Sequence, residues 1–325
     1  MNFQPRELEQ IRRWGDRLKG EVVLRLIRTP DDRTARLESF CDALARAVPS
    51  VKVIRQKGEE DELLPALRAG DRCAFHAVPE GTELGPFLEL LTLQGEEPGR
   101  LAEKLPSGAA SVEWATRFKL YVSPHCPHCP QMVKLAAPLP LVNPLFQTSV
   151  IDAGLFPEQA SQDGVQAVPT LLVDDEFRWT GVVAWPEILD VLTHRDPAQM
   201  SPATFKNMLK EGQASRVAEM MLERDEIFAA FPKLVAHPEW SVRLGALVVM
   251  EELTESRPDL ARRALGPLWE ELDGAADPVK GDILYLYGEL GGEEWVAPLE
   301  KLLSESPSEE LKPVLEEALE KLRGE

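Results

Sequence analysis

The stretch LYVSPHCPHCPQMVK, residues 120–134, decides the fold class of this sequence. Apolar residues typical of a strand come first, two cysteines two residues apart follow, and a helical pattern continues to Leu135. A cysteine pair with this spacing, at a strand-to-helix junction, can hold a metal, form a structural bridge or carry an electron pair.

A metal site is the weaker of these interpretations. Zinc needs about four ligands in a tetrahedral array, and the sequence has no second C-x-x-C pair. His125 and His128 could add nitrogen ligands, but Pro127 and the helix start would have to direct all four side chains to one ion. We therefore expect no metal and no cofactor, and a metal clip stays as an alternative.

A redox pair suits the spacing better, because C-x-x-C within a β-α-β pattern is typical of thiol-disulfide exchange. Backbone N–H groups and the positive end of the helix dipole stabilise a thiolate at a helix N-terminus. The sequence thus predicts Cys126 as the nucleophile and Cys129 as the thiol that resolves the mixed disulfide. Cys41 and Cys73 fit apolar patterns of a helix and a strand, and we expect both to be buried.

Composition limits the compartment and the partners. The chain has 325 residues, four cysteines and a net charge of -19. Its N-terminus lacks the apolar region of a signal peptide, and no apolar run is long enough to span a membrane. We expect a cytoplasmic protein that binds neither nucleic acid nor membrane surfaces, since both are anionic.

Strand and helix patterns divide the chain into three regions. Residues 1–107 read as a β-α-β unit followed by a strand and an apolar helix, and KLPSGAAS, residues 104–111, reads as a boundary. The pattern begins again in residues 108–198, which contain CPHC. From Ser201 onward the strand patterns stop, so residues 199–325 are expected to be helical.

Three segments of the helical region align at a period of 31 to 35 residues, judged from Pro232, Pro267 and Pro298. The second helix of each has apolar residues at offsets 0, 4, 7 and 11, which form one face of a helix. These are Val242, Ala246, Val249 and Leu253; Val279, Ile283, Leu286 and Leu290; and Leu311, Leu315, Ala318 and Leu322. Such units share a core only by stacking, which is the organisation of an α-solenoid.

These motifs resemble known families. CPHC and the later AVPT, with Val168-Pro169, resemble the thioredoxin fold, in which a cis-proline loop faces the active-site sulfurs. The first region resembles a second thioredoxin fold without the cysteine motif, since TPDDRTAR occupies its strand-to-helix junction. The pair resembles the tandem folds of glutaredoxin-like protein disulfide oxidoreductases and of the N-terminal domain of the alkyl hydroperoxide reductase flavoprotein subunit. The tail resembles HEAT repeats, including the Val-Arg or Val-Lys entry to the second helix.

The resemblance implies an α/β fold class: two tandem thioredoxin folds followed by an all-α HEAT-like solenoid. It implies that Pro127 and His128 tune the redox pair, and that Val168 and Pro169 help to bind substrate. A cationic His128 would favour the Cys126 thiolate and so the reduced form. Thioredoxins have a buried acid six residues before the first cysteine. This chain has Leu120 there, so that proton relay does not carry over.

The predicted function is that of a protein dithiol-disulfide oxidoreductase. Its expected partners are a protein substrate with a disulfide or dithiol, a reductase or flavoprotein electron donor, and a protein that docks on the HEAT-like tail. The alternative is a non-enzymatic adaptor, in which the solenoid binds a partner and the CPHC pair is a redox switch or metal clip.

Overall fold

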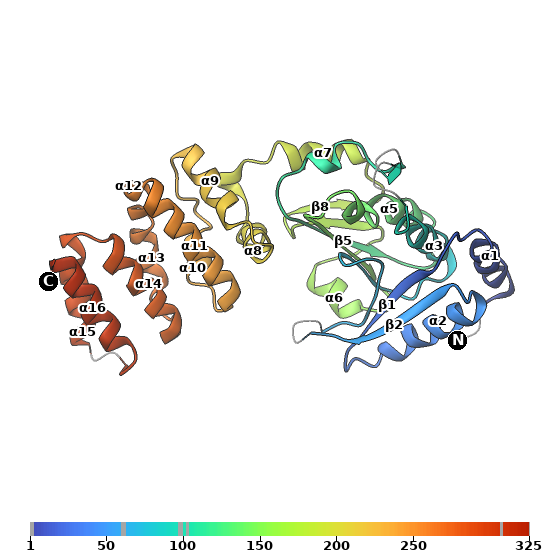
Figure 1. The fold of residues 1–325 in the computed structure, drawn as a ribbon, viewed down its shortest axis with the longest axis horizontal. Coiled ribbons are helices and arrows are strands. Elements are labelled where there is room, and N and C mark those ends of the chain that lie inside the picture. Colours follow the sequence, from blue (N-terminus) through green and yellow to red (C-terminus); the bar gives the residue numbers. More distant parts are fainter. Residues whose placement is uncertain (1–2, 60–62, 97–99, 102–103, 306–307, 325) are drawn as a thin grey trace. The chain divides into compact units, whose positions relative to one another are not determined.

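The structure is a computed structural model that describes residues 3–59, 63–96, 100–101, 104–305 and 308–324 (Figure 1). The outermost ends of the first and third predicted domains, residues 1–2 and 325, therefore lie outside the description. Contacts divide the chain into two compact units, Met1–His194 and Arg195–Glu325. The first is α/β and the second is helical, so the predicted fold class and a helical C-terminal part are confirmed.

The described strands of the first unit form one eight-stranded sheet in the order β2-β1-β3-β4-β6-β5-β7-β8. Each half repeats one pattern: its first two strands pair in parallel, and two antiparallel strands follow. Parallel pairing of β4 with β6, from Cys73↔Thr148 to His76↔Ile151, joins the halves. The strands are β1 (Val22–Arg28), β2 (Val51–Lys57), β3 (Ala66–Arg68), β4 (Cys73–His76), β5 (Thr116–Val122), β6 (Phe146–Asp152), β7 (Thr170–Val173) and β8 (Phe177–Thr180).

Helices cover both faces of the sheet, because its strands alternate apolar residues between two cores. In β5, Phe118, Leu120 and Val122 enter the larger core, whereas Tyr121 enters a smaller core under α6 on the other face (Figure 1). The larger core also holds residues of the remaining helices. The helices are α1 (Pro5–Gly15), α2 (Thr34–Ala47), α3 (Leu84–Leu93), α5 (Cys129–Ala136), α6 (Pro157–Gln162) and α7 (Trp185–Thr193).

Most of these elements agree with the sequence patterns. One strand was missed: β3 has three residues, which are too few to show an alternating pattern. The helix after the cysteines begins at Cys129, so Cys126 lies in the loop before it. The boundaries 1–107, 108–198 and 199–325 remain predictions, and the contact-based division falls after His194.

The cysteine-free junction of the first half anchors that half to the second. Arg33 stands where the resemblance would place the redox motif. Its guanidinium lies 4.1 Å from the centroid of the Phe156 ring and donates to the Leu155 carbonyl oxygen at 3.0 Å. It also forms ion pairs with Asp31 and Glu158. The strand-to-helix junction of the second half carries the disulfide, whereas the equivalent junction of the first half has a structural role.

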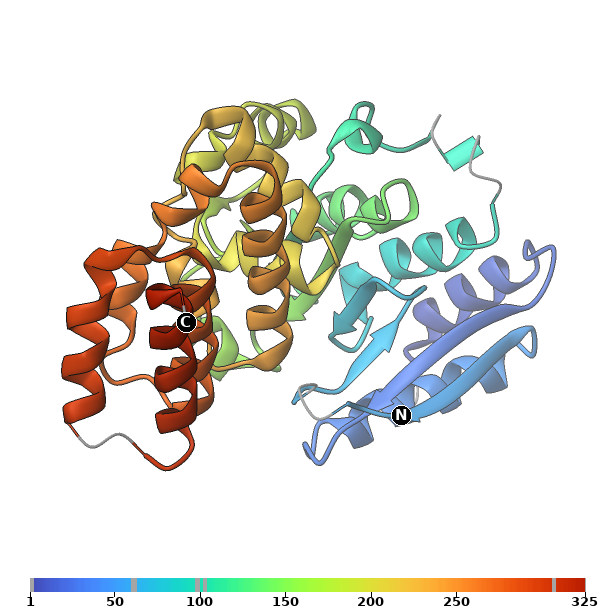
Figure 2. The same ribbon diagram turned by 60° about the vertical axis from the view of Figure 1, so that its left-hand side comes forward.

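The second unit is built of paired helices (Figure 2). Every residue of the three predicted apolar series is buried except Leu322, which is half-buried. The helices that carry these series are α11, α14 and α16, and the HEAT resemblance itself remains a prediction. The helices are α8 (Pro202–Lys210), α9 (Ala214–Arg224), α10 (Pro232–Val235), α11 (Trp240–Ser256), α12 (Pro258–Arg262), α13 (Leu265–Glu271), α14 (Asp277–Leu290), α15 (Val296–Ser304) and α16 (Leu311–Arg323).

A buried arginine links two of these helices. Arg243 of α11 is 5% exposed, and its Nε lies 2.7 Å from Oδ2 of Asp282 in α14. The same guanidinium donates to the carbonyl oxygens of His237 and Pro238 at 3.0 and 3.1 Å. The base in the Val-Arg entry therefore joins neighbouring helix pairs.

None of the helices in the described ranges has the length and apolar character that a membrane span requires.

Replacing Arg243 with alanine should lower the free energy of unfolding by about 3 kcal/mol, because it removes a buried guanidinium that bonds the partly buried Asp282 carboxylate and two carbonyl oxygens. Urea unfolding followed by circular dichroism measures the change. Arg323→Ala is the matched control, since the Arg323–Glu300 ion pair is exposed and such pairs contribute about 0.5 kcal/mol. Equal effects of the two substitutions would contradict a structural role for Arg243.

Candidate functional site

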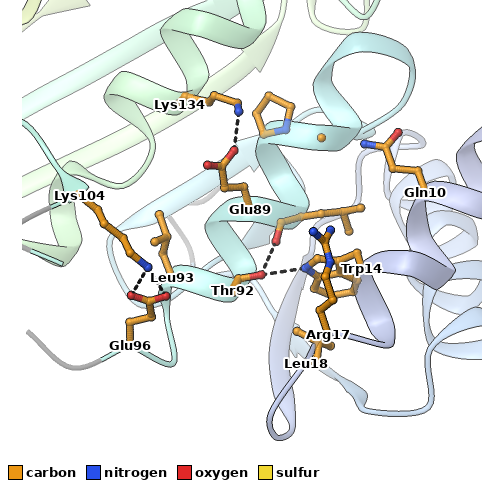
Figure 3. A pocket seen from close by; sticks show the side chains of 13 residues that line it. Gln10, Trp14, Arg17, Leu18, Glu89, Thr92, Leu93, Glu96, Lys104 and Lys134 are labelled. Carbon is orange, nitrogen blue, oxygen red and sulfur yellow. Dashed lines mark hydrogen bonds and ion pairs between the residues drawn. The ribbon is translucent and has the colours of Figure 1, made fainter. Parts of the chain in front are cut away.

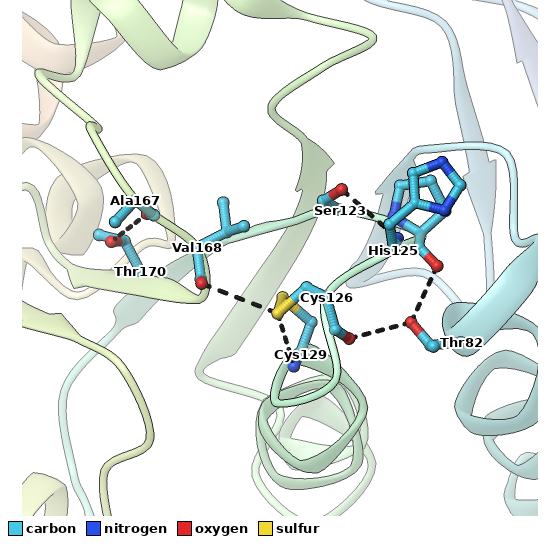
Figure 4. Close-up of a disulfide and its surroundings, with 9 residues drawn as sticks. Thr82, Ser123, His125, Cys126, Cys129, Ala167, Val168 and Thr170 are labelled. Carbon is cyan, nitrogen blue, oxygen red and sulfur yellow. Dashed lines mark hydrogen bonds between the residues drawn. A yellow bond between two sulfur atoms is a disulfide. The ribbon is translucent and has the colours of Figure 1, made fainter.

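The two cysteines of CPHC form a disulfide whose Cα atoms lie 5.5 Å apart (Figure 4). Cys126 follows β5 and is 8% exposed, whereas Cys129 is the first residue of α5 and is fully buried. The Cys129 backbone N–H donates to Cys126 Sγ at 3.1 Å. An amide at the helix N-terminus thus points at the sulfur that lies nearer the surface, which is the arrangement that favours a thiolate there on reduction.

The loop before β7 lies against this sulfur. The Val168 carbonyl oxygen is 3.7 Å from Cys126 Sγ, and the Val168–Pro169 peptide bond is cis (Figure 4). Pro169 is buried, and its carbonyl oxygen accepts from the Gly181 N–H at 2.8 Å. The structure therefore brings Val168 and Pro169 together with the cysteine pair, as the resemblance implied.

The histidines of the motif are exposed. His125 and His128 both lie on the surface, as does Pro127, and His128 immediately precedes the first residue of α5. Within the described ranges, no group of three or more His, Cys, Asp or Glu side chains is placed to hold a metal ion. The described residues therefore provide no ligand set that would support the metal-clip alternative.

A turn of the first half reaches the active-site loop. It is the 3-10 turn η1 (Gly81–Glu83), between β4 and α3. The Thr82 N–H donates to the Pro124 carbonyl oxygen at 3.1 Å, and the Thr82 hydroxyl lies 3.1 Å from the carbonyl oxygens of Pro124 and Cys126 (Figure 4). Gly81 has φ 57°, and a Cβ there would lie 2.6 Å from Pro124 O, so the contact requires glycine.

The same turn carries a buried acid. Glu83 is 2% exposed, and neither of its carboxyl oxygens has a hydrogen-bond partner among the described residues. Burial, and secondarily the nearby Asp152 carboxylate at the end of β6, raise the pKa of Glu83 to about 7. Leu120, at the position of the thioredoxin acid, is fully buried.

Sequence reasoning missed Glu83 and Thr82. Both lie more than forty residues before the cysteines, in the turn PEGTEL, and no local pattern marks their side chains as part of the site. The sequence signal that points toward Glu83 is Leu120 itself, because without an acid at that position a proton relay has to come from another part of the chain. Strand pairing between the two halves is what brings the turn to the site, and single-sequence patterns do not specify that pairing.

The remaining cysteines lie outside the site. Cys41 and Cys73 are both free and buried, which confirms the predicted burial. Desolvation raises the pKa of the Cys41 thiol to about 12, and that of Cys73 is also raised by burial. Neither forms a thiolate near neutral pH.

A groove of about 700 Å³ lies along α3 and is bordered by Gln10, Trp14, Arg17 and Leu18 (Figure 3). Its charges are largely matched at the rim, since Lys134 pairs with Glu89 and Lys104 pairs with Glu96. The Trp14 indole N–H donates to the Thr92 hydroxyl at 2.9 Å. This lining indicates no ligand of defined charge, and the groove contains neither cysteine of the motif.

After reduction, Cys126 should be alkylated first at neutral pH, ahead of Cys129, Cys41 and Cys73. Cys126 is 8% exposed and its sulfur accepts the N–H of the first residue of α5, whereas the other three cysteines are at most 2% exposed. Timed treatment with iodoacetamide followed by peptide mass spectrometry measures the order. Modification of Cys129 or Cys41 before Cys126 would contradict the assignment of the nucleophile.

Glu83→Gln should change how stability depends on pH. A carboxyl whose pKa rises on folding stabilises fully below about pH 4.5, and this stabilisation is lost as pH rises to about 7. Between pH 5 and 8 the free energy of unfolding of the native protein should fall by about 2.5 kcal/mol relative to that of the glutamine variant. Urea midpoints of the oxidised proteins test this, with Glu80→Gln as the control from the same turn. Parallel pH curves for the native protein and Glu83→Gln would contradict it.

Comparison with known proteins covers part of the chain. A thioredoxin domain family model matches residues 116–193. An NADH dehydrogenase of Ferdinandcohnia aciditolerans is 24% identical over 192 residues, 58% of this chain and 37% of that protein. An alkyl hydroperoxide reductase component of Staphylococcus aureus is 21% identical over 187 residues, 57% of this chain and 36% of that protein.

The chain therefore spans little more than a third of the length of these curated relatives. Among solved structures, a protein disulfide oxidoreductase from Aeropyrum pernix superposes with a TM-score of 0.50. It has 17% sequence identity, and the match covers 59% of this chain and 93% of that one. This likeness shows the fold, and together with the family match it identifies residues 116–193 as a thioredoxin-like domain.

Proposed function

We propose that this protein is a dithiol-disulfide oxidoreductase that acts on protein substrates. The observation that carries the proposal is the Cys126–Cys129 disulfide at the start of α5, with Cys126 Sγ beside the Val168 carbonyl. The names of the similar proteins, which include a protein disulfide oxidoreductase, support it.

The reduced pair exchanges two electrons in two steps. The Cys126 thiolate attacks one sulfur of the partner disulfide, that S–S bond breaks, and the released partner sulfur takes up a proton. Cys129 then loses its proton and attacks Cys126 Sγ in the mixed disulfide. The intermolecular bond breaks, the second partner sulfur takes up a proton, and the Cys126–Cys129 disulfide forms. The partner disulfide is reduced and the protein dithiol is oxidised.

Glu83 is proposed to accept the proton that Cys129 loses. A group exchanges protons best when its pKa lies near the working pH, and the pKa of Glu83 is about 7. Its turn is bonded to the active-site loop through Thr82, which supports a role for the acid in the site although it comes from the other half of the sheet. Glu83 would serve as the proton relay, which the apolar side chain of Leu120 cannot do.

The exposed residues around Cys126 are proposed to receive the substrate. Pro127 and His128 lie on the surface beside the reactive sulfur, and Val168 is half-buried next to Pro169. A cationic His128 next to α5 would favour the Cys126 thiolate over the thiol. These residues therefore set both access to the sulfur and its readiness to react.

The helical unit is proposed to hold a protein partner, and a reductase is proposed as the electron donor. Stacked helix pairs offer an extended surface, and Asp and Glu outnumber Lys and Arg in residues 195–325, which favours a neutral or basic partner. Relatives named as NADH dehydrogenase and as a component of alkyl hydroperoxide reductase support a donor of the reductase class.

The native protein should reduce a model protein disulfide with a chemical dithiol as donor, and Cys126→Ser should abolish this turnover. Cys129→Ser should accumulate the mixed disulfide, because the resolving thiol is missing. Insulin reduction and non-reducing electrophoresis measure the two effects, with Cys41→Ala as a control that keeps both reactive sulfurs. Absence of turnover by the native protein, with an intact pair, would favour the adaptor alternative.

A further inference from the structure

Cys126 lies in the loop before α5, so its carbonyl group lies outside the hydrogen-bond pattern of the helix. The residue four positions after it is Pro130, which has no N–H to donate. The N–H three residues later, that of Cys129, donates to Cys126 Sγ instead. An oxygen at the reactive residue thus needs a donor from elsewhere in the fold.

Thr82 supplies that donor. Its hydroxyl oxygen lies 3.1 Å from the Cys126 carbonyl oxygen and at the same distance from that of Pro124. The Pro124 oxygen already accepts the Thr82 N–H, so the one hydroxyl hydrogen is available to Cys126. The turn itself is held by the Gly81 N–H, which donates to Glu7 Oε1 at 2.9 Å.

We propose that Thr82 is a positioning residue of the redox pair: its hydroxyl donates to the Cys126 carbonyl oxygen, which lies outside the helix, and holds the Cys126 peptide in the geometry that attack requires. The assignment deepens the proposed function and rests on it. Under this assignment, the first half, which lacks the redox motif, directly affects the reactivity of Cys126 in the second half.

The hydrogen bond should stabilise the dithiol form more than the disulfide form. In the disulfide, the S–S bond itself fixes Cys126 relative to Cys129. After reduction that link is absent, and the Thr82 bond remains to hold the loop. The hydroxyl also draws electron density from the carbonyl oxygen, which lowers the repulsion that a nearby thiolate experiences. Loss of the hydroxyl should therefore make the pair a weaker oxidant.

Thr82→Val is the principal test, because valine keeps the backbone N–H and the β-branch and puts a methyl group where the hydroxyl was. The full chain is equilibrated with reduced and oxidised glutathione, and the fraction of Cys126–Cys129 disulfide is measured by mass spectrometry. The equilibrium should move toward the disulfide by about fivefold, the usual effect of one hydrogen bond, or about 20 mV for a two-electron couple. Thr82→Ser should behave as the native protein does.

Thr92→Val is the matched control, since it removes a hydroxyl of the same half that bonds Trp14 and the Leu88 carbonyl. Its glutathione equilibrium should equal that of the native protein. An unchanged equilibrium in folded Thr82→Val, or the same shift in Thr92→Val, would overturn the proposal. If the valine variant does not fold, the Thr82→Ser and Thr82→Ala pair decides, and equal equilibria for these two would overturn it.

The equilibrium separates this proposal from the proposed function. It requires only glutathione and the pair itself, whereas the function requires turnover of a protein disulfide. A native protein that shows no turnover, with a fivefold shift in Thr82→Val, would refute the function and leave the positioning role standing. Native turnover without that shift would do the reverse.

Discussion

The parallel pairing of β4 with β6 is the constraint on which the site depends. It sets the register between the two halves, and β5 is also parallel to β6, so the carboxyl ends of all three strands meet at one edge of the sheet. The turn with Glu83 follows β4, the loop with Cys126 follows β5, and Asp152 ends β6. The two parallel ladders that β6 forms with β4 and β5 therefore bring together an acid, a disulfide and the carboxylate that perturbs the acid.

The strand-to-helix junction of the first half anchors the two halves to each other, and the equivalent junction of the second half carries the cysteine pair. In the first half, Arg33 stacks on Phe156 and pairs with Asp31 and Glu158, and the Arg33 hydrogen bond lowers the pKa of Asp31. These contacts pair the charges of the junction, and its sequence contains no cysteine that could react. In the second half, the cysteines occupy the equivalent place, and the contacts that hold the loop come from outside through Thr82.

The sequence was sufficient where the signals are local. Alternation predicted most strands, the offsets 0, 4, 7 and 11 predicted the buried face of α11, α14 and α16, and the cysteine spacing predicted the pair. It failed for β3, which is too short for a pattern, and for Glu83 and Thr82, which are brought to the site by strand pairing. Because register is set by the packing of both halves, it cannot be read from one segment.

The matched thioredoxin-like domain, residues 116–193, does not itself hold every group that the proposed reaction uses. It has a leucine where thioredoxins have a buried acid, and the Cys126 carbonyl oxygen lies outside α5. The two proposals assign the acid to Glu83 and the donor to this oxygen to Thr82, both in the first half. Burying an acid without a partner costs stability, and it is tolerated here because the carboxyl stays largely neutral up to about pH 7. The first half lacks the cysteine motif of a redox site, and under these proposals it contributes a proton acceptor and a hydrogen-bond donor to the reaction of its neighbour.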